Sequence, residues 1–241
     1  MIYLDNSATT RTLDIAADTA AQYMKADFFN PAAAYSAAVE VERNINSARA
    51  RLANAIHAQS DEIIYTSGGT ESNNTAIFGA LRARRGGGRI IVGATEHPSV
   101  YEAAMSMKGP YAINEARVDK TGAYDVNVLA QSIANDVAFV SVMQVNNETG
   151  AINDIPAIYK AVKQRAPMAI MHVDGVQGFL KVPFDARYCD MYSISGHKFH
   201  APKGVGALYV KRGTRFAGGQ IGGGQERNLR SGTTNTPGIM G

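Results

Sequence analysis

Lys198 stands in the setting that is most suited to chemistry in this chain. It closes the segment Ser195-Gly196-His197-Lys198, which follows Met191–Ile194, an apolar run with the composition of a buried strand. A lysine forms an imine with a carbonyl compound when its amine is neutral, and the flanking His197 and Phe199 favour the desolvation that lowers the pKa of an ammonium group. Lys198 is therefore a candidate nucleophile, although a strand-end lysine is more often an exposed surface residue.

A candidate acid follows a second apolar segment. Ala169–Val173 ends directly before Asp174, and Gln177 lies about one helical turn further on. A carboxylate at this place can hold the nitrogen of a pyridine ring protonated, and the Gln177 amide can hydrogen-bond an oxygen on the same ring. The alternative interpretation of Asp174 is a helix cap.

A candidate anion site lies in Ser67–Asn74, which follows the apolar run Glu62–Thr66 and opens a helical pattern. Glycines such as Gly69 allow close backbone approach, a helix N-terminus offers free N–H groups to an anion, and Thr70 adds a hydroxyl. The segment matches neither the Walker loop nor the GxGxxG fingerprint, and an ordinary glycine-rich turn is the alternative.

His97 and Asn147 complete the set of candidates. His97 lies at a predicted strand end, where an imidazole could stack on a flat aromatic ring and relay protons, and a packed loop histidine is the alternative. Asn147 lies in Val145–Gly150 and could hydrogen-bond the same ring, although paired asparagines before a glycine more often simply form a turn.

Together these groups match what pyridoxal phosphate requires of a protein: an imine-forming lysine, an acid for the pyridine nitrogen and a phosphate cradle. A serine hydrolase is not favoured, because the chain has no GxSxG elbow. Cys189 lies beside Asp190 at the start of a predicted strand, where we expect a buried, inert thiol. His197 and His200 lack further clustered ligands, so we expect no metal site.

The predicted elements alternate between short apolar strands and helices, which indicates an α/β fold: a three-layer sandwich with a mainly parallel central sheet. Such sheets bind ligands beyond the carboxyl ends of their strands, which is where the candidate residues lie. The glycine-rich segment from Gly218 to Thr233 is predicted to be a loop, with no completed helix before Gly241. The predicted strands are Glu62–Thr66, Arg89–Gly93, Val137–Gln144, Ala169–Val173, Met191–Ile194 and Val205–Val210. The predicted helices are Ala37–Ala55, Glu71–Arg84, Ser99–Met107, Val126–Ala134 and Ile155–Arg165.

The composition is that of a globular chain of 241 residues, 45% hydrophobic and 19% charged, with a formal net charge of +3. That charge is too small to indicate nucleic-acid binding, and no apolar stretch approaches membrane-spanning length. Cys189 is the only cysteine, so no disulfide can form within the chain, and no signal peptide is evident. We therefore expect a cytoplasmic protein that binds neither nucleic acid nor membrane.

Taken in order, these segments resemble the cysteine desulfurases, which belong to the class V aminotransferase group of fold-type-I pyridoxal-phosphate enzymes. The resemblance extends over essentially the whole chain, and the combination of motifs is highly specific. The matching motifs are Tyr3–Thr10, Asn30-Pro31, Ser67–Asn74, Glu96-His97, Asn146–Glu148, His172–Gln177, Ser195–Lys198 and Arg230–Thr233.

The resemblance implies a role for each candidate residue. Lys198 would carry the imine with the cofactor, and His97 would stack on its ring and take part in proton transfers, so these are the implied catalytic residues. Thr233 would contact the phosphate in the other subunit, which implies a homodimer. The implied cofactor-binding residues are Gly69, Thr70, His97, Asn147, Asp174, Gln177, Ser195, His197, Lys198 and Thr233.

The implied reaction converts L-cysteine to L-alanine and places the sulfur, as a persulfide, on an enzyme cysteine. A sulfur-acceptor protein would then receive it for the synthesis of iron–sulfur clusters or other thio-compounds. A selenocysteine lyase or another class V aminotransferase fits the same residues. From a different class, a non-catalytic dimerising or scaffold domain is the alternative.

One departure concerns the family's small C-terminal domain, which carries the persulfide cysteine and the arginine that holds the substrate carboxylate. Residues 1–241 correspond to the large, cofactor-binding domain and have neither group at a matching position. We therefore expect this chain to bind pyridoxal phosphate without turning over cysteine by itself.

Overall fold

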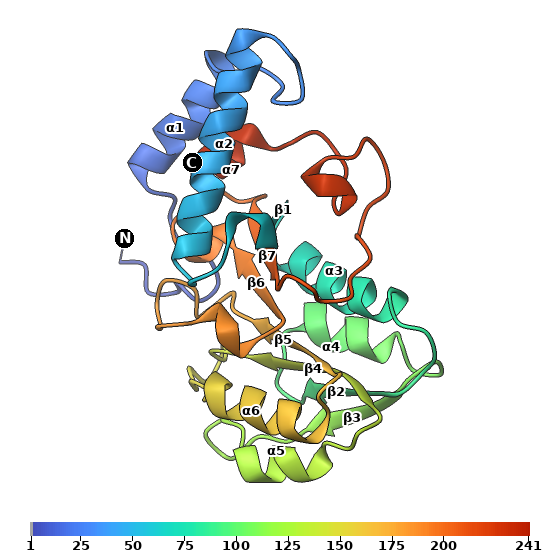
Figure 1. Cartoon of the computed structure of the whole chain (residues 1–241). Coiled ribbons are helices and arrows are strands. Elements are labelled where there is room, and N and C mark those ends of the chain that lie inside the picture. The colour runs from blue at the N-terminus through green and yellow to red at the C-terminus, as the bar shows by residue number, and fades with distance from the viewer. Residues whose placement is uncertain (1) are drawn as a thin grey trace.

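A seven-stranded sheet lies at the centre of the computed structural model, which describes residues 2–241 (Figure 1). The strands are β1 (Ile63–Thr66), β2 (Arg89–Gly93), β3 (Ala112–Ala116), β4 (Val137–Met143), β5 (Ile170–Asp174), β6 (Met191–Ser195) and β7 (Gly206–Val210). Their order across the sheet is β1-β7-β6-β5-β4-β2-β3. β7 is antiparallel to both of its neighbours, and all other pairs are parallel, which confirms the mainly parallel sheet that was expected.

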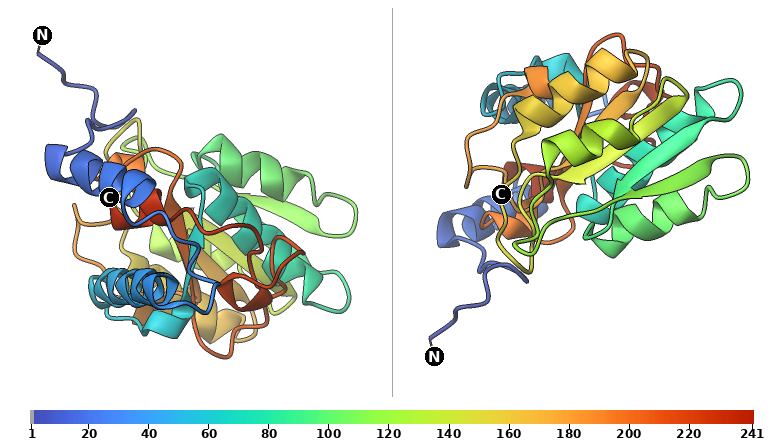
Figure 2. Two further views of the ribbon diagram at one scale, coloured as in Figure 1. Left: turned by 90° about the horizontal axis from the view of Figure 1, so that it is seen from above. Right: turned by 90° about the horizontal axis from the view of Figure 1, so that it is seen from below.

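Helices cover both faces of the sheet and make the three layers (Figure 2). The α-helices are α1 (Asp14–Lys25), α2 (Ser36–Asn54), α3 (Gly69–Arg82), α4 (Pro98–Met105), α5 (Val126–Ser132), α6 (Ile155–Arg165) and α7 (Thr236–Met240). Ile90 and Val92 of β2 belong to a core cluster with α3 and α4, whereas Ile91 belongs to the cluster with α2, α5 and α6. None of the helices in the described chain has the length and apolar character needed to cross a bilayer.

The predicted strands and helices are confirmed, with ends that differ by no more than about two residues, the usual uncertainty of such boundaries. β3 has no counterpart in the prediction, because it is an edge strand whose residues are mostly exposed or half-buried and form no apolar run. The expectation of a chain end without a completed helix is wrong. Asn235 caps α7 by accepting a hydrogen bond from Gly238 N, and Pro237 lies in its first turn.

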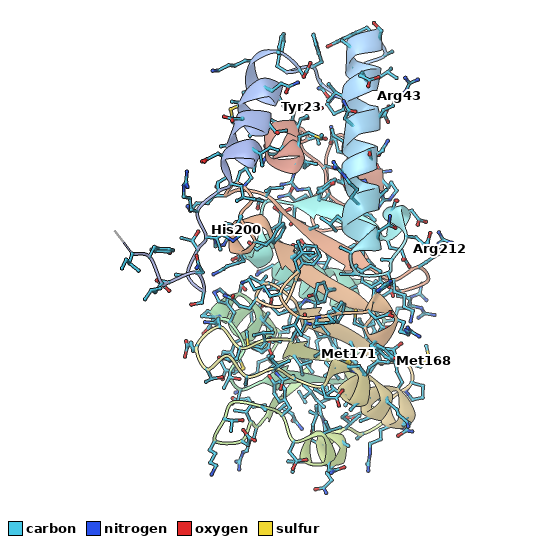
Figure 3. The ribbon with its side chains drawn as sticks, turned by 90° about the vertical axis from the view of Figure 1, so that its left-hand side faces the viewer. Tyr23, Arg43, Met168, Met171, His200 and Arg212 are labelled. Atoms are coloured by element: carbon cyan, nitrogen blue, oxygen red, sulfur yellow. The ribbon has the colours of Figure 1, made fainter. Side chains whose placement is uncertain are left out.

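α1 is a further helix that was not predicted. It packs against α7, and α7 also contacts α2 (Figure 1). It buries Ala16, Ala20 and Tyr23, which recur at helical spacing, but two of the three are small and give a weak apolar signal. Tyr23 lies between α1 and α2 (Figure 3), where its hydroxyl accepts a hydrogen bond from Asn44 Nδ2 at 3.0 Å.

The carboxyl ends of the parallel strands meet at one edge of the sheet. Asp174, the last residue of β5, pairs with Met143 at the end of β4 and with Ser193 of β6. Ser195 ends β6 two residues further on. The polar segments that follow these strands therefore gather at a single edge, as the ligand-binding rule for open α/β sheets requires.

Candidate active site

A cavity of about 680 Å³ opens at this edge of the sheet. It is lined by segments that follow β1, β2, β4, β5 and β6, so only the folded sheet assembles it. Every candidate residue from the sequence except Thr233 lines this cavity. These residues are Gly69, Thr70, His97, Asn147, Asp174, Gln177, Ser195, His197 and Lys198.

Lys198 is half-buried in the short turn that follows β6. Its Nζ donates hydrogen bonds to the backbone carbonyls of Ser7 and Ala8, at 2.5 and 2.8 Å. Burial and the positive charge of Lys181 lower the pKa of Lys198, and the carboxylate of Asp174 opposes this shift. A lowered pKa increases the share of neutral amine, which is the form that attacks a carbonyl carbon.

Asp174 is the buried acid of the cavity, with 3% of its surface exposed. Its Oδ1 accepts a hydrogen bond from Val176 N and its Oδ2 accepts one from Asn73 Nδ2, both at 2.9 Å. Burial raises the pKa of Asp174, while these hydrogen bonds and the charges of His97 and Lys198 oppose the rise. No α-helix of residues 2–241 begins at Asp174, so the helix-cap alternative is wrong.

The segment after β1 is the candidate anion site, here called the anion cradle. Gly68 has φ 150° and ψ −174°, a conformation that is almost restricted to glycine, and α3 begins directly after it. A Cβ on Gly69 would lie 2.8 Å from Val176 Cγ2, so glycine allows the start of α3 to pack against the cavity wall. Helix N–H groups together with the hydroxyls of Thr70 and Ser195 suit a phosphate.

An ion pair neutralises the carboxylate in the first turn of α3. Glu71 accepts a hydrogen bond from Ser67 N at 2.8 Å, and it pairs with Arg230 through Nε at 2.7 Å and Nη2 at 3.1 Å. Burial acts to raise the pKa of Glu71, but the hydrogen bonds from Arg230 and Ser67 outweigh it and lower that pKa overall. The cradle can therefore accept an anion without facing an unpaired negative charge.

The remaining candidates lie around the same cavity. His97 is the N-cap of α4, where its Nδ1 accepts a hydrogen bond from Ser99 N at 3.1 Å, and its exposed ring is available to a flat ligand. Gln177 is buried and donates from Nε2 to the carbonyl of Ser7 at 2.7 Å. Asn147 lines the cavity from the segment that follows β4.

The N-terminal arm, residues 2–13, is a part of the site to which the sequence analysis assigned no chemistry. Ser7 and Ala8 line the cavity. The arm is held by His197, whose Nδ1 lies 3.0 Å from Thr9 Oγ1 and whose carbonyl accepts a hydrogen bond from Thr10 N at 2.9 Å. The motif Tyr3–Thr10, which carries part of the family resemblance, is the signal in the sequence for this contact.

Two residues discussed from the sequence lie elsewhere. Thr233 is exposed and does not line the cavity of its own chain, so its service to a second copy stays a prediction. Cys189 is fully buried, which confirms the expected burial, and burial raises the pKa of its thiol well above the usual range; its inertness stays a prediction. Within residues 2–241 no group of three or more His, Cys, Asp or Glu side chains is arranged to hold a metal ion.

The described part of the chain matches one family of known proteins along its whole length. A model of the aminotransferase class V family matches residues 2–241. Cysteine desulfurases from a Nostoc species and from Azotobacter vinelandii, the latter named NifS, are each 40% identical to it, over 244 and 245 residues. Both alignments cover 100% of this chain and 60% of the relative, so the chain spans about 60% of the length of these curated relatives.

Solved structures share the fold. A NifS-like protein matches with a TM-score of 0.95 and 35% sequence identity, covering 99% of this chain and 67% of the other. A structure described as SspA in complex with cysteine matches with a TM-score of 0.93 and 30% identity, covering 100% of this chain and 70% of the other. The chain therefore belongs to the aminotransferase class V family, within which it is similar to the cysteine desulfurases.

Proposed function

We propose that this chain is the pyridoxal-phosphate-binding part of a cysteine desulfurase, which converts L-cysteine to L-alanine and transfers the sulfur as a persulfide. The names of its relatives and the neighbour described in complex with cysteine support this substrate. The observation that carries the proposal is the joint placement of Lys198, Asp174 and the anion cradle on one cavity.

The residues of the cavity fit pyridoxal phosphate. Asp174 offers a buried carboxylate for a protonated ring nitrogen. Within residues 2–241, the Lys198 amine donates hydrogen bonds only to two backbone carbonyls of the N-terminal arm and is engaged by no carboxylate, so it is available to an aldehyde carbon. Because Gly69 has no side chain, the start of α3 can pack against Val176 in the cavity wall, where its free N–H groups suit a phosphate. When bound, the cofactor supplies an electron sink for charge that develops on the substrate.

We assign the reacting roles to three side chains. Lys198 binds the cofactor and gains or loses a proton at Nζ. Asp174 stabilises a proton on the ring nitrogen by its negative charge. His97 covers the ring and takes part in proton transfer through its imidazole.

The other residues bind and orient. Gln177 and Asn147 hydrogen-bond the edge of the ring, and the phosphate is held by helix N–H groups and small polar side chains. Burial, and next the positive charge of Lys198, lower the pKa of His197, so its ring serves the phosphate as a neutral donor. Thr233 serves the phosphate of a second copy, in a homodimer. The phosphate-binding residues of one chain are Gly69, Thr70, Ser195 and His197.

No arginine and no cysteine among the described residues lines the cavity. A substrate carboxylate is commonly held by a bidentate arginine, and persulfide formation needs a thiolate. We therefore propose that residues 1–241 bind the cofactor but do not turn over L-cysteine by themselves. The complete activity would be cytoplasmic and would pass sulfur to an acceptor protein, for iron–sulfur cluster or thio-compound synthesis.

The test is the visible absorption spectrum of the chain with added pyridoxal phosphate, followed by L-cysteine. A new visible band should form in the wild type and in Lys203→Ala, which removes an exposed lysine five residues away, but not in Lys198→Ala. L-cysteine should then release no alanine. A wild type without a band, or a band that survives in Lys198→Ala, would refute the cofactor proposal, and steady alanine release would refute the proposal of an inactive isolated chain.

A further inference from the structure

A chain of hydrogen bonds joins His97 to Asp174. Asn73 Nδ2 donates to Asp174 Oδ2 and to Ser99 Oγ, each at 2.9 Å. Ser99 Oγ lies 2.8 Å from His97 Nδ1, and Ser99 N donates to the same ring nitrogen at 3.1 Å. The proposed function gives roles to His97 and Asp174, at the two ends of this hydrogen-bonded series. It gives none to Asn73 and Ser99, which connect them.

The carboxylate sets the direction of these hydrogen bonds. An ionised carboxylate only accepts, so the Asn73 amide must turn its nitrogen, and not its oxygen, toward Asp174. The same nitrogen gives its second hydrogen to Ser99 Oγ, whose own hydroxyl hydrogen is then free to point at His97 Nδ1.

The Asn73 amide keeps this direction although its oxygen is left without a partner in the described part of the chain. Asn73 is 1% exposed, and its buried Oδ1 has no hydrogen-bond partner within residues 2–241. The amide therefore leaves an acceptor unsatisfied while both of its donors are used. Turning the amide over would set Oδ1 against the carboxylate oxygen of Asp174, where two acceptors would repel each other.

We propose that Asn73 and Ser99 are positioning residues that hold the proton of neutral His97 on Nε2. The Ser99 N–H donates to Nδ1, and the direction derived above makes the Ser99 hydroxyl a second donor to it, so Nδ1 carries no hydrogen when the ring is neutral. Nε2 makes no hydrogen bond within the described chain, and the ring lines the cavity. His97 therefore offers an N–H donor to a ligand in the cavity while Asp174 is ionised. The consequence for catalysis rests on the proposed function, whereas the position of the proton does not.

The position of the proton can be measured directly on the cofactor-free chain. In protein labelled with ¹⁵N-histidine, long-range nitrogen–proton NMR correlations distinguish a protonated from an unprotonated ring nitrogen. The signals of His97 are those lost in His97→Gln. His57 is an internal reference, because it is exposed and its ring makes no hydrogen bond within residues 2–241. We expect the ratio of Nε2–H to Nδ1–H in His97 to exceed that of His57 about three- to tenfold, the effect of one net hydrogen bond.

Matched variants test the two positioning residues. Asn73→Ala and Ser99→Ala should each lower the His97 ratio toward that of His57, whereas Ser99→Thr keeps the hydroxyl and should keep the ratio. Asp174→Asn should also lower it, because an amide can donate as well as accept and no longer dictates the direction. A wild-type ratio no higher than that of His57 would overturn the assigned proton position. If both Asn73→Ala and Ser99→Ala keep the His97 ratio of the wild type, the positioning role is overturned.

The same spectra show whether each variant is folded. The ring of His172 is buried between the hydroxyls of Ser141 and Ser193, at 2.8 and 2.9 Å, so its signals report on the core. If Asn73→Ala does not fold, the pair Ser99→Ala and Ser99→Thr still decides the question. Because no cofactor is present, a failure to bind pyridoxal phosphate would refute the proposed function and leave this result intact.

Discussion

Replacing Glu96 with glutamine should abolish a large part of the loss of stability that this chain undergoes as the pH rises from about 6 to about 9. Glu96 is 8% exposed, and its Oε1 accepts hydrogen bonds from Tyr124 Oη at 3.0 Å and from Met143 N. Its buried Oε2 has no partner within residues 2–241. Burial, and next the negative charge of Asp174, raise the pKa of Glu96 to about 8.

The sign and size of the effect follow from the two states of the chain. The reference pKa of this carboxyl is 4.5, and the folded chain raises it to about 8. Between these values the folded state holds a proton that the unfolded state releases, so a rise in pH favours unfolding. Each pH unit well inside this window corresponds to about 1.4 kcal/mol, and the loss levels off above the folded pKa, so the total from about pH 6 to about pH 9 is about 2.7 kcal/mol. A glutamine keeps the acceptor at Oε1 and does not titrate.

Urea unfolding followed by far-UV circular dichroism, at about pH 6 and about pH 9, measures this difference. Glu115→Gln is the matched control, because Glu115 accepts the same kind of bond from a tyrosine, Tyr101 Oη at 2.8 Å, but is exposed to water. The control should track the wild type at both pH values. If Glu96→Gln and the wild type lose the same stability to within about 1 kcal/mol, Glu96 does not hold a proton in the folded chain and the reasoning is wrong.

Three further predictions concern other parts of the chain. Cys189 should react with a thiol reagent only after unfolding, because its thiol is buried and its pKa is raised, and rapid reaction in the folded chain would contradict this. Arg49→Met should lower the free energy of unfolding in urea by about 3–5 kcal/mol, since it leaves Glu226 buried without its guanidinium. The same change at Arg11, in an exposed ion pair, should lower it by less than about 1 kcal/mol, and equal losses would refute the comparison. Leu180→Gly should raise the free energy of unfolding by about 1 kcal/mol, because Leu180 has φ 61°, a left-handed conformation that strains leucine but not glycine. Its side chain is 64% exposed, so little packing is lost, and a lower free energy of unfolding would contradict the strain at this position.

The candidate site could be predicted to a large extent because its residues follow a general rule of open sheets. Short apolar runs identify the strands locally, and the rule that ligands bind beyond their carboxyl ends then places Asp174, Ser195 and Lys198 together. The glycines before Thr70 also predicted the anion cradle from local sequence, because the turn between a strand and a helix depends on adjacent residues.

Elements with a weak local signal could not be predicted. β3 lies at the sheet edge with most of its residues exposed or half-buried, and α1 buries mainly small side chains, so neither shows a strong apolar period. These elements are stabilised by their packing partners, α1 by α7 and β3 by β2. Their identity as a helix or a strand therefore depends on contacts more than on local propensity.

The sequence by itself determined which side chains could do chemistry and at which edge of the sheet they would lie. Only the tertiary structure decided which atoms of those side chains face one another. Asn73 meets Asp174 across 101 residues of chain, and Lys198 meets Ser7 across 191. Local sequence patterns do not predict such pairs, because they are made by elements that the fold brings together from distant parts of the chain. The burial of an ionisable group such as Glu96 is decided in the same way.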